Sequence, residues 1–461
     1  MTDTELASHE WWESYREVVN GDPELGVRGH DAFDENFYVE IGDERTLIRM
    51  NEGEIEDVVP NPTLNHRWSF GVEGSREAWE EFVSEKPPAF NHEIIASHYR
   101  SAVAGDEGHL QLTGDNKKVF QNLRAFQRTL ELMRVAHNGG SVSTRGAFEA
   151  GDGIEPIAGN YVHIDVDGTD HRVYYEENGP EDGIPLLCQH TAGCNNGEWR
   201  HLLSDESITD DFRVIAYDLP YHGKSVPPTS EPWWEEDYTL TAEEFAETIV
   251  AIADALEIED PIYMGSSMGG NVTLELADWY PERFRALIGL ECGAHSPGFY
   301  IDWLDHPHIN TTEVNAYACW GLMAPQSPEQ ARRETMYHYE QGATGVFKGD
   351  LYYYSVDHDY RGKLDRVNAE ECPLYIVNGE YDYLTTPEDG RETAEGIGEG
   401  ATAVEMGKIG HFPMSEHPEL FNAYLGELLA DVTGEREGEL PDVLSPADVG
   451  VELGPSAPDA S

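Results

Sequence analysis

A serine between two glycines is the first feature of this sequence that could do chemistry. Residues 265–269 read GSSMG, after the apolar run 261–264 and before a stretch of helical pattern from Gly270 to Tyr280. Strand, Gly-x-Ser-x-Gly and helix in this order are typical of a sharp turn that exposes a serine nucleophile. Glycine suits both flanking positions because it tolerates strained backbone and close approach. We therefore predict that Ser267 is a nucleophile.

A serine hydroxyl needs a neighbouring base, and the base needs a carboxylate that orients it. Asp382 follows the apolar run 374–377, and His411 lies in a loop before a helix near Pro418. Taken singly, either residue fits an ordinary turn or loop. Because all three fall on suitable loops in the order Ser, Asp, His, the sequence favours a catalytic triad. Glu291, after the apolar run 286–290, is an alternative acid.

An oxyanion formed at this serine would need two backbone N–H donors. Met268, directly after the nucleophile, is predicted as the first donor. The second is expected in the loop 189–193, which follows the apolar run 186–188. Ala192 is our choice there, with Thr191 as the alternative.

The elements around these residues alternate between short apolar strands and helical stretches. Strands are expected at 186–188, 212–217, 262–264, 286–290 and 374–377, and helices near 243–256, 272–280 and 419–429. A hairpin precedes them, with strands 161–166 and 172–175 joined by a turn at Asp167-Gly168. The alternation predicts a mainly parallel sheet, at whose carboxyl edge ligands bind.

Several motifs together resemble the α/β-hydrolase fold family: residues 189–193 (QHTAG), 217–225 (YDLPYHGKS), 265–269, 379–382 (GEYD) and 410–412 (GHF). The likeness covers about 161–430. It implies nucleophile Ser267, acid Asp382 and base His411, with oxyanion donors Ala192 and Met268. The sequence has His190-Thr191 where the family often has His-Gly.

The segment from about 293 to about 367 separates two core strands, is too long for a bare loop, and is expected to form a cap. Its many aromatic residues predict a cap core and the roof of an apolar pocket. Trp233-Trp234 either joins that roof or packs elsewhere. A metal site at His306-Pro307-His308 or Asp357-His358-Asp359 is not favoured, because neither pair of ligands has a convergent third.

The first 138 residues form a separate module that contains strand and helix patterns. Their order, with residues 110–115 (LQLTGD) and Asn122-Leu123, resembles the sterol-carrier-protein-2-like fold over about 33–134. The resemblance implies an apolar tunnel that holds lipid or acyl groups. The alternative is a small α+β domain that serves dimerisation or solubility.

Domain boundaries follow from composition. We expect an SCP2-like domain at 1–138, a linker at 139–156, a hydrolase domain at 157–432 and an acidic disordered tail at 433–461. The fold class is therefore α/β with a helical cap, preceded by an α+β domain.

The charge of the chain is strongly negative: 89 acidic against 29 basic residues give a net charge of −60. The acids are spread along the whole chain, which favours a halophilic protein whose surface is screened by salt. Nucleic acids and anionic membranes are disfavoured as partners, since no basic patch exists. Five cysteines without C-x-x-C pairing, no signal-peptide pattern and no long apolar run favour a cytoplasmic protein without a membrane span.

The sequence thus predicts a serine hydrolase acting on a small-molecule ester or thioester with an apolar acyl group, without cofactor or metal, and allows a homodimer. Within the same fold, C–C bond hydrolysis or a cofactor-free peroxidase or lyase reaction is an alternative. A lipid-binding or carrier protein with a subsidiary hydrolase module is another.

Overall fold

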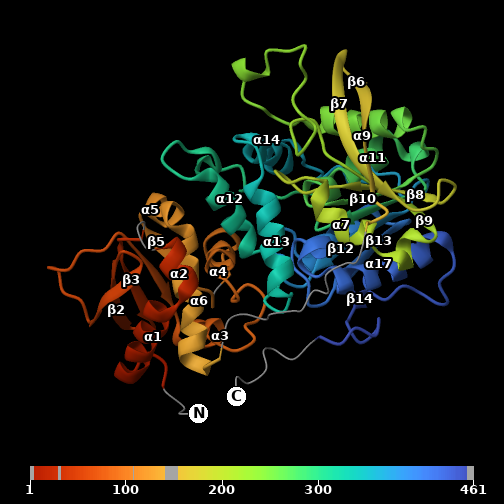
Figure 1. Cartoon of the computed structure of the whole chain (residues 1–461). Coiled ribbons are helices and arrows are strands. Elements are labelled where there is room, and N and C mark those ends of the chain that lie inside the picture. Colours follow the sequence, from red (N-terminus) through yellow and green to blue (C-terminus); the bar gives the residue numbers. More distant parts are fainter. Residues whose placement is uncertain (1–4, 30–32, 107, 141–153, 454–461) are drawn as a thin grey trace. The chain divides into compact units, whose positions relative to one another are not determined.

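The computed structural model describes residues 5–29, 33–106, 108–140 and 154–453 (Figure 1). The chain divides into two compact units. Of the described residues, unit 1 comprises those up to 140 together with His306–Glu329, and unit 2 comprises 154–305 and 330–453. The predicted linker lies largely in 141–153, outside the described residues.

Unit 2 is built on a nine-stranded sheet of order β14-β13-β12-β11-β10-β8-β9-β7-β6. From β9 to β14 all neighbouring strands are parallel, and only the β6–β7 hairpin and its pairing with β9 are antiparallel. The strands are β6 (Ala158–Val166), β7 (Thr169–Asn178), β8 (Ile184–Gln189), β9 (Phe212–Tyr217), β10 (Ile262–Ser266), β11 (Ala286–Leu290), β12 (Leu374–Gly379), β13 (Ala401–Met406) and β14 (Val443–Leu444). This mainly parallel sheet and its hairpin confirm the predicted fold of the larger module.

Helices cover the sheet on both faces because its strands are apolar on both. On one face, alternate strand residues such as Leu186, Met264 and Ile288 pack with Trp199 and Phe421 in a buried cluster. Figure 1 shows α9 and α11 on one side of this sheet and α17 on the other. The helices of unit 2 are α7 (Arg200–Leu203), α8 (Glu206–Thr209), α9 (Ala242–Ala255), α10 (Met268–Asn271), α11 (Thr273–Trp279), α13 (Glu329–Glu340), α14 (Val346–Tyr352), α15 (Pro387–Ile397), α16 (Pro413–Glu416) and α17 (Pro418–Thr433).

Helix α9 illustrates why these segments are helical. Thr241 caps it in a reciprocal capping box with Glu244, which satisfies backbone donors at its first turn. Phe245, Ile249 and Ile252 recur at helical spacing and are fully buried. Burial of this stripe, more than local propensity, stabilises the helix.

The predicted disordered tail is wrong for residues 433–453. Val443 and Leu444 form β14, which extends the sheet in parallel beside β13. Leu444 is buried, and Leu440, Val449 and Val451 pack against the main core of unit 2. A few apolar residues in an acidic stretch suffice here because the open edge of β13 supplies hydrogen-bonding partners. Residues 454–461 lie outside the described residues.

Unit 1 is an α+β structure with a five-stranded sheet of order β3-β2-β1-β4-β5. Its elements are α1 (His9–Gly21), α2 (Pro23–Arg28), β1 (Asn36–Ile41), β2 (Glu44–Asn51), β3 (Glu54–Pro60), β4 (Phe70–Gly74), α3 (Arg76–Phe82), α4 (Ile94–Tyr99), β5 (Gln111–Gly114), α5 (Asn116–Gln121), α6 (Leu123–Asn138) and α12 (Thr311–Trp320). Ser75 caps α3, with its side chain accepting from the amide of Ala78 at 3.1 Å.

Part of the predicted cap belongs to unit 1. Residues 306–329, with α12, pack on the N-terminal residues: Arg124 pairs with Glu313 at 3.3 Å, and His92 Nε2 lies 2.9 Å from the carbonyl of Gly321. The continuous cap predicted from sequence length is therefore split between the units, because contacts far apart in sequence decide which domain a segment joins. No helix within the described ranges is long and apolar enough to span a membrane.

Candidate active site

The predicted site residues all follow strands at one edge of the unit 2 sheet. Ala192 follows β8, Ser267 follows β10, Glu291 follows β11, Asp382 follows β12 and His411 follows β13. These five strands are adjacent and parallel, so their carboxyl ends meet at the same edge. That edge is where open parallel sheets bind ligands.

Ser267 occupies a strained turn between β10 and α10. Its φ of 58° and ψ of −115° are rare for a residue with a side chain, and such strain concentrates at functional sites. The turn is fixed by hydrogen bonds from Ser267 N to Leu290 O at 2.9 Å and from Asn271 N to Ser267 O at 2.8 Å. A Cβ on Gly265 would collide with the carbonyl of Gly269, so the first glycine of the motif is required by close packing.

His411 is paired with Asp382, as the triad requires. Its Nδ1 lies 2.8 Å from Oδ2 of Asp382, and both side chains are buried. Asp382 also accepts from the amide of Leu384 at 2.8 Å and from the hydroxyl of Thr385 at 3.0 Å. Burial disfavours the charged carboxylate, but the charge and hydrogen bond of His411 outweigh it and lower the pKa of Asp382. The Ser267 hydroxyl makes no hydrogen bond with the imidazole within the described part of the chain. Such contacts often tighten only when substrate binds.

Glu291, the alternative acid, does not hydrogen-bond to the imidazole. Both its carboxyl oxygens face the amide of Gly379, at 3.0 and 2.8 Å. Burial and the neighbouring Asp382 charge raise the pKa of Glu291 well above its usual value. Of the two carboxyls, Asp382 therefore holds a negative charge more readily than Glu291 does.

In the loop after β8, the amides on either side of Ala192 are engaged. The amide and the hydroxyl of Thr191 donate to the buried carboxyl of Glu198, at 2.9 and 2.8 Å. The amide of Gly193 donates to Asp350 Oδ2 at 2.6 Å. Among the described residues, the amide of Ala192 between them has no acceptor, and neither does that of Met268. Thr191, the alternative donor, has no N–H left for a ligand.

Asp350 joins a cap helix to this loop. It lies on α14 and also contacts His222 Nε2 at 2.8 Å and the Tyr238 hydroxyl at 3.0 Å, with no exposed surface. Burial alone would lower the pKa of His222, but Asp350 reverses this and raises it. Asp350 and His222 thus form a buried hydrogen-bonded pair next to the loop that carries Ala192.

The cap contributes aromatic residues of two kinds. Tyr339, Tyr353 and Tyr354 are buried, which fits the predicted cap core, while the predicted apolar pocket beneath them stays a prediction. Trp233 and Trp234 are 46% and 67% exposed and pack edge-to-face on each other, so they do not form part of a roof.

Among the described residues, three potential metal ligands lie close together at this edge of the sheet. Ligand atoms of Glu291, Asp382 and His411 lie within 4.8 Å of one another, but each is already engaged in the hydrogen bonds described above. At the two sequence candidates the side chains have other partners. His308 contacts Lys117 at 2.9 Å, Asp357 accepts from the amide of Ala242 at 2.7 Å, and His358 pairs with Glu275 at 2.8 Å.

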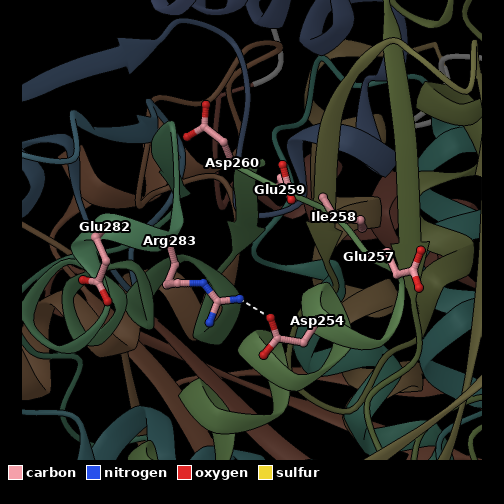
Figure 2. Close-up of a pocket in the computed structure, with 7 residues that line it drawn as sticks. All are labelled: Asp254, Glu257, Ile258, Glu259, Asp260, Glu282 and Arg283. Atoms are coloured by element: carbon pink, nitrogen blue, oxygen red, sulfur yellow. Dashed lines mark hydrogen bonds and ion pairs between the residues drawn. The ribbon is translucent and has the colours of Figure 1, made fainter.

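A hollow of about 570 Å³ lies at the opposite edge of the sheet, before β10 and β11 (Figure 2). Figure 2 shows acidic side chains around Arg283, which pairs with Asp254. The lining is mostly acidic and contains none of the candidate site residues, so this hollow is separate from the candidate active site.

Sequence reasoning missed Glu198 and Asp350, and it treated Tyr354 only as cap aromatic. No local motif marks Glu198. A polar residue among apolar cap positions was the only available signal for Asp350.

Comparison with known proteins agrees with this architecture. Residues 184–309 match the family model described as alpha/beta hydrolase fold. The chain is 24% identical over 261 residues to 3-oxoadipate enol-lactonase 2 of Acinetobacter baylyi, covering 55% of this chain and 91% of that protein. It is 24% identical over 293 residues to the 2-hydroxy-6-oxononadienedioate/2-hydroxy-6-oxononatrienedioate hydrolase of Burkholderia vietnamiensis, covering 60% and 96%.

Among solved structures, the enol-lactonase from Burkholderia xenovorans LB400 superposes with a TM-score of 0.50 at 20% sequence identity. The match covers 59% of this chain and 100% of that chain. This likeness concerns the fold. Unit 2 of this chain therefore has the alpha/beta hydrolase fold, and its homologues indicate a hydrolase.

Proposed function

We propose that unit 2 is a serine hydrolase that cleaves a carboxylic ester or thioester with an apolar acyl group. The observation that carries this proposal is the 2.8 Å contact between His411 and Asp382 at the edge where Ser267 stands in a strained turn. A relative named as an enol-lactonase supports it, because a lactone is a cyclic ester.

In this proposal the carboxylate of Asp382 accepts a hydrogen bond from Nδ1–H of His411. That bond fixes the tautomer in which Nε2 is the free base. His411 then takes the proton of Ser267 as its Oγ attacks the carbonyl carbon. The amides of Ala192 and Met268 donate to the developing oxyanion.

Collapse of the tetrahedral intermediate breaks the bond to the leaving group, which takes the proton from His411. Water then attacks the acyl-enzyme, with His411 again as base, and releases the acid. In this proposal Glu291, whose pKa is raised, stays protonated beside Asp382, so that a single negative charge faces the imidazolium formed in each step.

The test of this proposal is p-nitrophenyl ester hydrolysis by the full chain and by Ser267→Ala, in molar KCl because the net charge is −60. We expect the variant to lose at least about 10³-fold in kcat. Ser266→Ala, which changes the neighbouring buried serine, is the matched control. Turnover retained by Ser267→Ala would refute the assignment.

Hydrolysis of a C–C bond is the second candidate. A relative is named for a 2-hydroxy-6-oxo dienedioate, a substrate name without an ester or lactone group. A panel that includes such a vinylogous diketone alongside esters distinguishes the two, since the preferred class will show the higher kcat/KM.

For unit 1 we keep the sterol-carrier-like resemblance and its lipid binding as a proposal. Its α+β character is compatible with that resemblance. Mass spectrometry of lipid extracted from the purified full chain, with a fluorescent fatty acid as titrant, tests it. Absence of both extracted lipid and saturable binding would favour the structural alternative.

A further inference from the structure

Tyr354 brings a hydroxyl from the cap to the nucleophile. It lies in a π-helical turn (Tyr353–Asp357) that follows α14, and its side chain is fully buried. Turns of this kind are rare and often occur at functional sites. The turn packs against α10, the short helix that begins after Ser267.

The surroundings of this hydroxyl are polar. Ser267, Ser296 and Thr385 are its hydroxyl-bearing neighbours. Among the described residues, however, none makes a hydrogen bond of regular geometry with the Tyr354 oxygen. A buried hydroxyl that lies among other hydroxyls without a hydrogen bond of regular geometry can exchange these weak contacts for a stronger one, so its place beside the nucleophile points to a ligand as its partner.

The strand order sets where its hydroxyl neighbours lie relative to Ser267. The loop with the free Ala192 amide follows β8, on one side of β10. Ser296 and Thr385 follow β11 and β12, on the other side. Ser296 and Thr385, the hydroxyl neighbours of Tyr354, therefore lie on loops across β10 from the loop that carries the predicted oxyanion donor.

An ester carbonyl under attack carries two oxygens, the developing oxyanion and the leaving-group oxygen. If the first is held on the β8 side, the second is free to point toward β11 and β12. We propose that the Tyr354 hydroxyl donates a hydrogen bond to the leaving-group oxygen of an oxygen ester, and so makes this site selective for oxygen esters over thioesters. This inference rests on the serine hydrolase function proposed above.

In the proposed step Tyr354 keeps its own proton. His411 gives its proton to the departing oxygen, the C–O bond breaks, and its electron pair stays on that oxygen while Tyr354 stabilises it. Burial and the nearby Asp382 charge raise the pKa of Tyr354, so the phenol remains a donor at neutral pH. Sulfur is a weak hydrogen-bond acceptor, and a thioester leaving group would gain little from it.

The test compares an oxygen ester and a thioester with the same acyl group on the parent chain and on Tyr354→Phe. We expect kcat/KM for the oxygen ester to fall about tenfold and that for the thioester to change less than about threefold, as loss of one neutral hydrogen bond predicts. Tyr337→Phe, at a mostly exposed cap tyrosine, is the matched control and should change neither.

Thermal unfolding and phosphonate labelling of Ser267 establish that Tyr354→Phe is folded with a reactive serine. An equal fall for both substrates, or no fall for either, would overturn the inference even if the parent is an active serine hydrolase. If the parent chain hydrolyses neither substrate and Ser267 is not labelled, the proposed function itself fails, and this inference with it.

Discussion

The two sides of Ser267 present different groups, backbone amides on one side and ionisable side chains on the other. On the β8 side, backbone amides of the loop are held by buried carboxyls, Glu198 on Thr191 and Asp350 on Gly193, which leaves the amide of Ala192 free. On the β11–β13 side, the groups are side chains that share or pass protons. The Glu291–Asp382 pair with its imidazole lies there.

This difference suits the two sides to two tasks, stabilisation of the developing charge and proton transfer. Stabilising a developing charge needs donors that do not reorganise, and a main-chain loop clamped by carboxyls provides them. Proton transfer needs groups whose protonation changes during the reaction, and buried side chains with shifted pKa values provide these. Substitutions on the two sides should therefore differ in size and in kind.

The largest effect is expected from Asp382→Asn. An amide at this position presents N–H to Nδ1 of His411 and favours the wrong tautomer. We expect kcat to fall about 10³–10⁴-fold with little change in KM. Steady-state kinetics on a p-nitrophenyl ester measures kcat of the variant. A fall in kcat of less than about tenfold would show that Asp382 does not orient His411.

An intermediate effect is expected from Asp350→Asn on the other side. The substitution removes the charge that pairs with His222 and loosens the clamp on Gly193, so that the Ala192 amide is less well fixed. We expect kcat to fall about 10–10²-fold, less than for removal of a whole oxyanion donor, together with a lower Tm. Asp365→Asn, at an exposed cap residue, is the control. Unchanged kcat in a destabilised Asp350→Asn would show that the clamp supports folding alone.

The smallest effect on rate is expected from Glu291→Gln. The raised pKa of Glu291 favours its neutral form, so glutamine keeps both that charge state and the acceptor for the Gly379 amide. We expect kcat within about threefold of the parent. A loss as large as that of Asp382→Asn would instead make Glu291 an ionised member of the triad.

The same variant has a signature in stability. The folded-state pKa of Glu291 is raised, so the unfolded chain loses this proton at lower pH than the folded chain does. The free energy of unfolding contributed by this group therefore falls as pH rises above the ordinary glutamate pKa. Relative to the parent, the Tm of Glu291→Gln should increase from about pH 5 to about pH 8. A constant difference across that range would contradict a neutral Glu291.

Local pattern predicted much of unit 2. The apolar runs 186–188, 262–264 and 286–290 became β8, β10 and β11, and the glycines at 265 and 269 predicted the turn on which Ser267 lies. The expectation that this turn exposes the serine is wrong, because Ser267 is buried. These features depend on residues close in sequence, so periodicity and turn chemistry are enough to find them.

Features that depend on distant contacts were missed. Glu198 and Asp350 act on the loop after β8 through side chains 7 and 157 residues away, which no local pattern marks. Strand β14 forms because β13 offers an open edge, and α12 joins unit 1 through contacts to residues near the N-terminus. The lipid-binding role of unit 1 stays a prediction for the same reason, since it depends on an interior that sequence pattern alone does not define.

The most direct test of the central claim is covalent labelling of the full chain with a fluorophosphonate, followed by peptide mass spectrometry. A phosphonyl group on Ser267, with labelling strongly slowed in His411→Ala, is the predicted result. A label on another residue, or full ester turnover by a protein whose Ser267 stays unmodified, would contradict the account.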